Sequence, residues 1–496
     1  MGYKAKKKMR IYCYQKFRSL KFIKNEGEGL SMNTKLSLKV KVSYGLGDFG
    51  SCLISMMIAF NFSYFCSVIL GLPLAVVGFL TLSVQVWDAI NDIYIGHRVD
   101  RTHTKEGKAR PWLKRFALPD AIVAVLIFAV PTSFNIPAKI IWVAIAYFIY
   151  VLFHTCIVLP YSSLMPLITK DSMERASLST FRMIGASCGS LVVASTAQPL
   201  IGLFSSYIEN KAMCYGIVML IYAFAAFIMF MTVYRNCPEV TQQEEEVNNV
   251  NDNLAKAEDK GKLLYNIKAL LKNRAWVVTF LIGAILFIRT PFYGSALIYY
   301  FTYYLGLPEA QSSIMATFGT VAGLLAYPFV GTVIRKLDHK KTIIVSSIIM
   351  SLGMLGAFFA GKNISIAIIL YCIDMFAESF AFVSVVSMVA DSIDYGDYLF
   401  HVRLEGLGFA AYSFATKAAP AMGNLLLSLV LIIGGLDTTQ GLGGVQTDSA
   451  IMAVRASMFF IPAVMAPLVG ILAAFYPLNK KKNAEIEEIL KERSIR

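Results

Sequence analysis

Charged side chains are scarce in this chain. They make up 16% of its 496 residues, whereas soluble proteins carry about 25%. Apolar residues make up 56%, and the mean hydropathy is +0.59. This composition excludes a disordered chain, a disulfide scaffold and an ordinary soluble enzyme. It is typical of a polytopic membrane protein, in which each spanning helix needs about 20 apolar residues.

Motifs that carry enzymatic chemistry are missing as well. The sequence has no Walker lysine, no HExxH, no nucleophile elbow and no zinc-binding spacing. Its eight cysteines are scattered without a CxxC or a Cys/His grouping, and we interpret them as reduced core residues. We therefore expect no enzymatic activity, no cofactor and no ATP-driven step in this chain.

The net charge of +14 does not indicate a nucleic-acid partner. Lys and Arg lie in short stretches between apolar segments, where they set topology and contact membrane lipid headgroups. The basic stretches 97–115, 335–341 and 477–496 alternate with connections such as 131–137 and 434–449, which have almost no Lys or Arg. We expect a multi-pass protein of the plasma (cell) membrane with both termini in the cytoplasm.

Twelve apolar segments follow one another along the chain. They lie near 43–70, 74–98, 116–134, 138–168, 180–207, 213–234, 275–305, 309–335, 341–361, 364–392, 404–435 and 450–476. The hydrophilic stretch 235–274 divides them six and six. A basic turn follows the second segment of each half, after Gly96 and after Gly331. The predicted fold is all-α, with twelve transmembrane helices in two six-helix bundles.

The predicted domains follow from these segments. They are a basic N-terminal segment 1–42, a first bundle 43–234, a cytoplasmic linker 235–274, a second bundle 275–476 and a cytoplasmic tail 477–496. Residues 1–31 are Lys-rich and have no apolar run long enough for a secretory signal. We expect them either to precede the natural start of the protein or to be disordered.

Three polar residues share one face of the second apolar segment. Asp88, Asn91 and Asp92 lie at positions i, i+3 and i+4, which aligns them on one side of a helix. A charge in mid-membrane costs about 2.5–3.5 kcal/mol on insertion scales and so marks a functional site. Oxygen ligands suit a small cation, while a carboxyl beside a like charge can hold a proton. We predict a Na⁺ or H⁺ site, the alternative being that Asp92 is merely solvated.

For several other polar residues inside the apolar segments, the sequence leaves more than one role open. Thr155 could complete the cation site or bond to its own helix, and the neighbouring His154 could titrate or be structural. Arg182 could snorkel to the surface. Arg289, followed by Tyr293, is near the middle of its segment and needs either a substrate or a carboxylate partner such as Asp374 or Glu378. We place substrate contact slightly ahead.

A second set of charges lies at the cytoplasmic ends of the segments. We predict that it forms a gate of ion pairs, made of Asp100, Arg101, Asp391, Asp394, Arg403 and Glu405. Such pairs would form and break as one half rocks against the other. Deeper in the eleventh segment, Lys417 is a candidate partner for an intramembrane carboxylate.

Six blocks in order carry a family resemblance. They are YGLGDFG at 44–50, WDAIND at 87–92, GKARPW at 107–112, LPYSSLMP at 159–166, ADSIDYG at 390–396 and RLEG at 403–406. With these blocks the chain resembles the glycoside–pentoside–hexuronide:cation symporters of the major facilitator superfamily, the group that includes melibiose permease. The resemblance covers nearly the whole chain and implies a secondary transporter.

The resemblance also implies roles for single residues. It matches Asp88, Asn91, Asp92 and Thr155 to the family's cation site. Arg182 matches an arginine near the sugar, and Lys417 matches a lysine that couples the halves. The sequence departs from melibiose permease where that protein holds its galactoside, because Cys52 and Val158 replace two aspartates and Ser162 replaces a tryptophan. Asp48, one turn before Cys52, is a possible substitute.

The leading hypothesis is a monomeric transporter that imports a glycoside or related sugar with Na⁺ or H⁺. Its predicted substrate contacts are Asp48, Cys52, Val158, Ser162, Arg182, Arg289, Tyr293 and Lys417. The basic residues among them would suit an anionic sugar such as a glucuronide. A lysolipid or amphiphile carrier of the same fold is the main alternative and would need a lateral apolar opening. A membrane enzyme or a receptor is disfavoured by the missing motifs and the short outer loops.

Overall fold

The computed structural model describes residues 36–102, 104, 106–169, 171–239, 267–400, 404–437 and 446–495, and these residues are mostly helical. The first group of helices is α2 (Leu38–Tyr64), α3 (Leu74–Asp100), α4 (Arg110–Phe128), α5 (Ile136–Ile168), α6 (Ser172–Ser205) and α7 (Lys211–Asn236). The second is α10 (Arg274–Gly294), α11 (Ala296–Tyr299), α12 (Ser312–Phe359), α13 (Ile364–Phe400), α14 (Glu405–Ile433), α15 (Asp448–Arg455) and α16 (Ile461–Ala474), followed by α17 (Lys480–Ile495). The predicted all-α class is confirmed.

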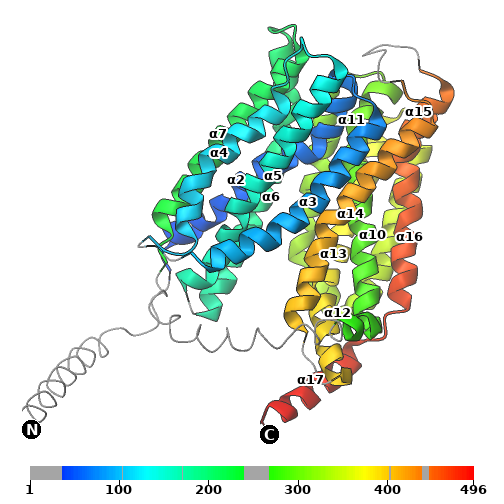
Figure 1. The fold of residues 1–496 in the computed structure, drawn as a ribbon. Helices are drawn as coiled ribbons and strands as arrows, with labels where there is room; N and C mark the ends of the chain where they lie inside the picture. The colour runs from blue at the N-terminus through cyan, green and yellow to red at the C-terminus, as the bar shows by residue number, and fades with distance from the viewer. Residues whose placement is uncertain are drawn as a thin grey trace, which may run out of the picture.

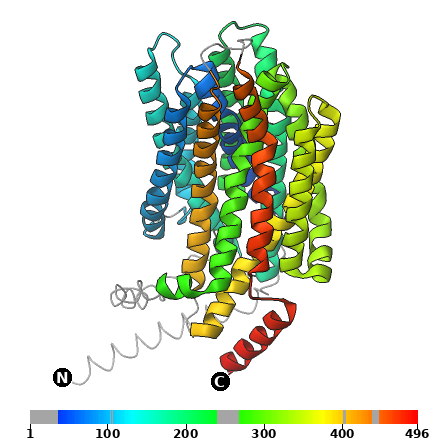
Figure 2. The same ribbon diagram turned by 90° about the vertical axis from the view of Figure 1, so that its right-hand side faces the viewer.

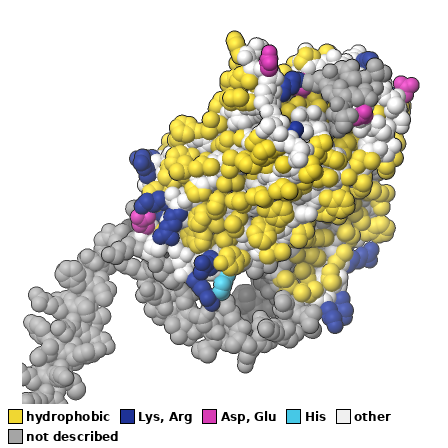
Figure 3. Space-filling view, turned by 45° about the horizontal axis from the view of Figure 1, so that its top comes forward, with side chains coloured by type: hydrophobic (Ala, Val, Ile, Leu, Met, Phe, Trp, Pro, Cys, Tyr) yellow, Lys and Arg dark blue, Asp and Glu magenta, His cyan; other side chains and the backbone are white. Residues whose placement is uncertain are grey.

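The two groups stand side by side (Figures 1 and 2). We call the end with α11 and α15 the α15 end, and the opposite one the α17 end. Hydrophobic side chains cover a broad band of the face seen in Figure 3, and charged ones lie toward its margins. Residues 1–31 and most of the linker, 240–266, lie outside the described residues.

The structure has fewer separate apolar helical stretches than the twelve spans that the sequence predicts. In the described part of the chain, ten helical stretches are long and apolar enough to cross a membrane. Helix α4 is not among them, since its first turns carry Arg110, Lys114 and Arg115. Helix α12 counts once, although its 48 residues would extend about 72 Å, more than twice the roughly 30 Å hydrocarbon core. The chain turns at Asp338, whose φ is +73°.

The turn at Asp338 divides α12 into two arms that run in opposite directions. On the first arm, a side-chain carbon added at Gly319 would touch Tyr371 of α13, and one at Gly323 would approach Ser379. On the second arm, Gly353 faces Leu370 instead. Helix α13 is therefore parallel to the first arm, and because the second arm runs in the opposite direction, α13 is antiparallel to it.

The first connection in each group has the same structure. Gly-Leu-Pro occurs at 71–73 and at 306–308, each time after a π-helical turn, Phe65–Ile69 or Tyr300–Tyr304. Gly71 and Gly306 have φ of +72° and +68°, which glycine adopts without strain. This repeat, which the sequence analysis missed, indicates that the two groups share one plan.

The groups are joined at the α15 end. The Tyr299 hydroxyl of α11 shares hydrogen bonds with Ser63, at 3.4 Å, and with Ser67, at 2.6 Å. Lys211 forms an ion pair with Glu309 at 3.1 Å. Toward the α17 end the groups separate in Figure 1.

Candidate functional site

The motif GKARPW leads into α4, and Glu239 anchors it. Glu239 accepts hydrogen bonds from the backbone N–H groups of Lys108, Ala109 and Arg110 at 2.8–2.9 Å, which suits a carboxylate at a helix N-terminus. Hydrogen bonds from Lys114 and Tyr234 hold the pKa of Glu106, in the preceding loop, below its usual range. This motif therefore fixes the connection between α3 and α4.

The motif WDAIND orients α3 against α5. Trp87 donates a hydrogen bond to the carbonyl of Phe148 at 3.2 Å, and Asn91 donates to that of Val151 at 3.4 Å. These two residues are four positions apart, so both point to α5. Asn91 is buried, with 2% of its surface exposed. Its amide positions α3, and its predicted role as a cation ligand stays a prediction.

Asp88 and Asp92 point to the second helix group. The Lys417 ammonium of α14 lies 2.9 Å from Asp88 Oδ2 and also bonds to Asp92 Oδ2. The Thr155 hydroxyl of α5 donates to Asp88 Oδ1 at 3.2 Å. The structure thus brings together three of the four predicted cation-site residues, and it places the predicted lysine between the two carboxylates.

A cavity of about 290 Å³ adjoins this charge group and is lined from both helix groups. Its polar lining includes Gln85 and Tyr150 from the first group and Asn424 from the second. The Gln85 Oε1 atom and the Tyr150 hydroxyl are buried and lack a hydrogen-bond partner among the described residues. Sequence analysis missed both, although Gln85 lies three residues before Asp88 and so shares its helical face.

His154 connects this cavity to a buried acid. Its Nδ1 lies 3.4 Å from Asp120 Oδ1, and its Nε2 lies 3.2 Å from the Ser51 hydroxyl. Asp120 on α4 has no exposed surface. The rule that an acid in an apolar segment marks a site would have found Asp120, which the sequence analysis passed over.

Asp48 and Arg182 form a separate group within the first set of helices. Arg182 donates to Asp48 through Nε at 2.5 Å and through Nη2 at 3.2 Å, a bidentate geometry. Its guanidinium lies over the Tyr161 ring at 4.9 Å and reaches the Ser162 hydroxyl at 3.5 Å. The structure favours this pairing with Asp48 over the alternative that Arg182 snorkels to the surface. Two further predicted substrate contacts, Cys52 and Val158, are half-buried.

Arg289 has its own partners on α13. Its guanidinium bonds to Asp374 and lies 2.9 Å from Glu378 Oε1, while Nε donates to the Pro462 carbonyl at 3.3 Å. Arg289 and Asp374 have no exposed surface, and Tyr293 lies beneath the guanidinium at 5.4 Å. The structure therefore favours the carboxylate partners over the substrate contact that we predicted for Arg289 and Tyr293.

Only some residues of the predicted gate lie in the part of the chain that the structure describes. Asp391 accepts a hydrogen bond from Asn483 of α17 at 2.7 Å, so this acid holds the tail helix. Arg101 lies just after the end of α3. Arg403 and the side chains of Asp100 and Glu405 lie outside the described residues. The gate, including Asp394, stays a prediction.

Comparison with known proteins identifies the family of this chain. The profile of the family described as MFS/sugar transport protein matches residues 43–480. The chain belongs to this family. It is a membrane transport protein and not an enzyme, as the sequence predicted.

Individual relatives and a solved structure agree with this assignment. The chain is 26% identical to the isoprimeverose transporter of Lactiplantibacillus pentosus over 453 residues, 90% of this chain and 91% of that protein. It is 28% identical to the glucuronide carrier protein homolog of Escherichia coli (strain K12) over 461 residues, 92% and 96% of the two chains. The crystal structure of a D-xylose-proton symporter matches its fold with a TM-score of 0.63, at 15% identity, over 90% of this chain and 98% of that one.

Proposed function

We propose that this transporter imports a glycoside in symport with Na⁺ or H⁺ by alternating access of one central site. The observation that supports this proposal most directly is the position of the Lys417 ammonium between Asp88 and Asp92. With both carboxylates ionised, two negative charges and one positive charge leave a net charge of −1. One Na⁺ or one proton would neutralise the group, and a net charge is costly where the side chains keep only 14–33% of their surface exposed. Cation binding would thereby loosen a contact between the two helix groups.

The proposal places twelve spans in two six-helix bundles. The ten apolar stretches supply ten of them. The two arms of α12 count as two spans, and α4, which packs among α5 and α7, is the twelfth. The basic residues of 97–115 and 335–341 and the tail helix α17 argue that the α17 end is cytoplasmic. In this orientation the described conformation faces the cytoplasm, since Tyr299 and Glu309 join the groups at the outer end.

The substrate site of this proposal is the cavity beside Lys417. Its unpaired Gln85 and Tyr150 polar atoms are suited to sugar hydroxyls, because a buried polar group without a partner is costly until a ligand satisfies it. The relatives named for isoprimeverose and for a glucuronide support a glycoside. A neutral one is favoured, because Arg182 and Lys417 are already paired with carboxylates.

Transport into vesicles tests the proposal. Purified protein is reconstituted, and uptake of labelled neutral glycosides and glucuronides is measured under a Na⁺ gradient and, separately, under a proton gradient. We expect one gradient to drive accumulation of a neutral glycoside. Accumulation of glucuronides alone would overturn the neutral preference. Uptake that never exceeds equilibration under either gradient would overturn symport.

A further inference from the structure

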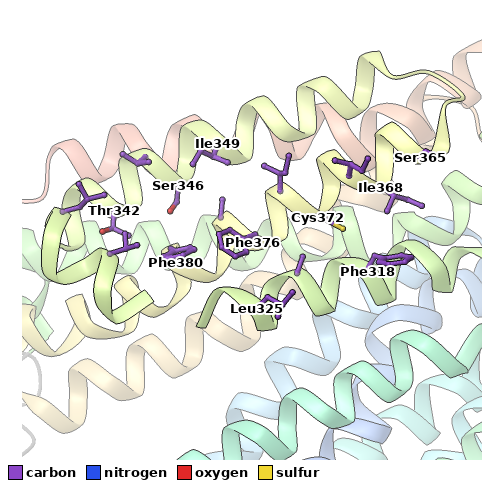
Figure 4. Close-up of a pocket in the computed structure, with 17 residues that line it drawn as sticks. Phe318, Leu325, Thr342, Ser346, Ile349, Ser365, Ile368, Cys372, Phe376 and Phe380 are labelled. Atoms are coloured by element: carbon purple, nitrogen blue, oxygen red, sulfur yellow. The ribbon is translucent and has the colours of Figure 1, made fainter. Parts of the chain in front are cut away.

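A second, larger cavity lies away from the central site. It has a volume of about 920 Å³ and is bounded by the two arms of α12 and by α13 (Figure 4). Several side chains that line it are strongly exposed, with Leu325 and Ile369 both 60% accessible. It is therefore an open groove on the outside of the second helix group.

The groove is not an entrance to the central site. On the first arm of α12, Ala316 and Thr320 point toward the first helix group, where they line a small cavity with α6. Phe318 and Leu325 belong to the opposite side of the same arm and line the groove. The groove therefore does not provide the lateral opening into the central site that a lysolipid carrier would need.

The composition of the groove matches a hydrocarbon chain. Its lining is aliphatic and aromatic apart from Thr342, Ser346, Ser365 and Cys372. Between Leu325 and Leu337 it follows α12 for about 18 Å at 1.5 Å per residue. One leaflet contributes about 15 Å to the hydrocarbon core. An acyl chain that enters from the α17 end would therefore fit along this part of the groove.

Positive charges stand at the same end of the groove. Lys336 and Lys341 are exposed on either side of the turn between the arms. Lys336 is three residues after the lining residue Val333, and Lys341 is four before the lining residue Val345. These spacings put both ammonium groups on the helix faces that form the groove.

The acid in this turn is already bound elsewhere. Asp338 accepts hydrogen bonds from its neighbour His339 at 2.6 Å and from the Lys480 backbone at 3.0 Å. Neither bond involves Lys336 or Lys341, so in the described structure this acid is not their ion-pair partner.

We propose that this groove is a binding site for an anionic phospholipid. One acyl chain lies between the arms of α12 and against α13, and the headgroup phosphate is held by Lys336 and Lys341. Bilayers attract basic side chains through anionic headgroups, and the apolar lining adds the energy of chain burial. This lipid site belongs to the second helix group and is separate from the sugar and cation site.

Native mass spectrometry of the purified full chain tests this site. Phosphatidylglycerol and phosphatidylcholine with identical acyl chains are added, and the bound fractions are compared. We expect the wild-type chain to retain more phosphatidylglycerol, by about fivefold for each lysine. The double variant Lys336→Gln/Lys341→Gln should lose this preference. The double variant Lys39→Gln/Lys272→Gln changes the same charge at exposed positions outside the groove and should keep it.

A second pair of variants tests the apolar part. Leu325→Trp fills the groove and should lower retention of both lipids. Leu352→Trp, at a residue of α12 that is 64% exposed and outside the groove, should not. Equal loss in the control variants would overturn the proposal. A dimer that dissociates in the Leu325→Trp variant and does not respond to lipid would also overturn the proposal. In that case the groove would be occupied by a second copy of the chain.

Discussion

The Lys417 ammonium on α14 lies 2.9 Å from a carboxylate oxygen of Asp88 on α3. One side chain of the second helix group thus compensates part of an acidic pair in the first. Because the same ammonium also bonds to Asp92, any cation that binds these carboxylates competes with a contact between the groups. Competition of this kind links ion binding to the relative position of the two halves.

The first prediction concerns coupling. Asp92→Asn should lower cation-driven accumulation at least about tenfold, within the usual range of coupling energies, while sugar exchange across the membrane survives. The reason is that the group then has no net negative charge for a Na⁺ or a proton to neutralise. Counterflow and gradient-driven uptake in the same vesicles would separate the two activities.

Two comparisons make this result specific. Asp88→Asn should behave like Asp92→Asn. Glu209→Gln removes an acid at an exposed position before α7 and should transport normally. If Asp88→Asn and Asp92→Asn both retain full accumulation, these carboxylates do not form the coupling site.

The second prediction concerns sugar hydroxyls. Tyr150→Phe should raise the apparent KM for the sugar about three- to tenfold, the effect of one hydrogen bond, with little change in protein stability. The matched control is Tyr412→Phe, which removes another buried hydroxyl without a partner among the described residues but lies outside the cavity. Equal KM values in Tyr150→Phe and Tyr412→Phe would argue against sugar binding in this cavity.

The third prediction concerns the pair of Asp48 and Arg182. Arg182→Gln should reduce transport about five- to thirtyfold, the factor that corresponds to one or two kcal/mol, because most of this pair is buried. Arg182→Lys should rescue only partly, because an ammonium lacks the two parallel donors. A double-mutant cycle with Asp48→Asn measures the coupling. Transport that returns fully in the double variant would identify the pair as structural, whereas a persistently raised KM would place it at the substrate.

Several features of this site could be predicted from the sequence because they depend on local spacing. Asp88 and Asp92 share a helix face wherever α3 packs, and Lys417 needs a carboxylate in any membrane-spanning arrangement. The partner of Arg289 could not be chosen in advance, because spacing along α10 does not tell which helix it faces. Only the packing of α10 against α13 puts Asp374 and Glu378 within its reach.

Other features required three-dimensional information or a rule that had not been applied throughout. Gln85 and Tyr150 are ordinary polar residues of apolar helices until the fold turns them toward one cavity. The break within α12 could be predicted, because the sequence separates the apolar segments 309–335 and 341–361, but the positive φ of Asp338 could not, although Asp is one of the non-glycine residues that adopt it most often. The repeated Gly-Leu-Pro was visible in the sequence, but its meaning depends on the shared backbone conformation at Gly71 and Gly306.

The last prediction concerns the buried group of Arg289, Asp374 and Glu378. Arg289→Gln should lower the folding yield and the melting temperature, because it leaves two buried carboxyl groups without their cation. Removing one partner of a buried ion pair costs about 3–5 kcal/mol. Yield of monodisperse protein and thermal unfolding in detergent are the measurements. The exposed pair of Lys114 and Glu106 offers a contrast, since an exposed ion pair contributes little to stability and Lys114→Gln should hardly change the melting temperature.

Rescue distinguishes this structural role from substrate binding. Combining Arg289→Gln with Asp374→Asn restores the formal charge of the group from −2 to −1 and should recover much of the yield. Its affinity for a neutral glycoside and for a glucuronide should then change by the same factor, because the guanidinium has no surface exposed to the cavity. A selective loss of glucuronide affinity in a well-folded Arg289→Gln protein would instead return Arg289 to the substrate site. Wild-type yield and transport in Arg289→Gln would contradict both roles, since a mid-membrane arginine that binds neither a carboxylate nor a substrate would have no compensation for its burial.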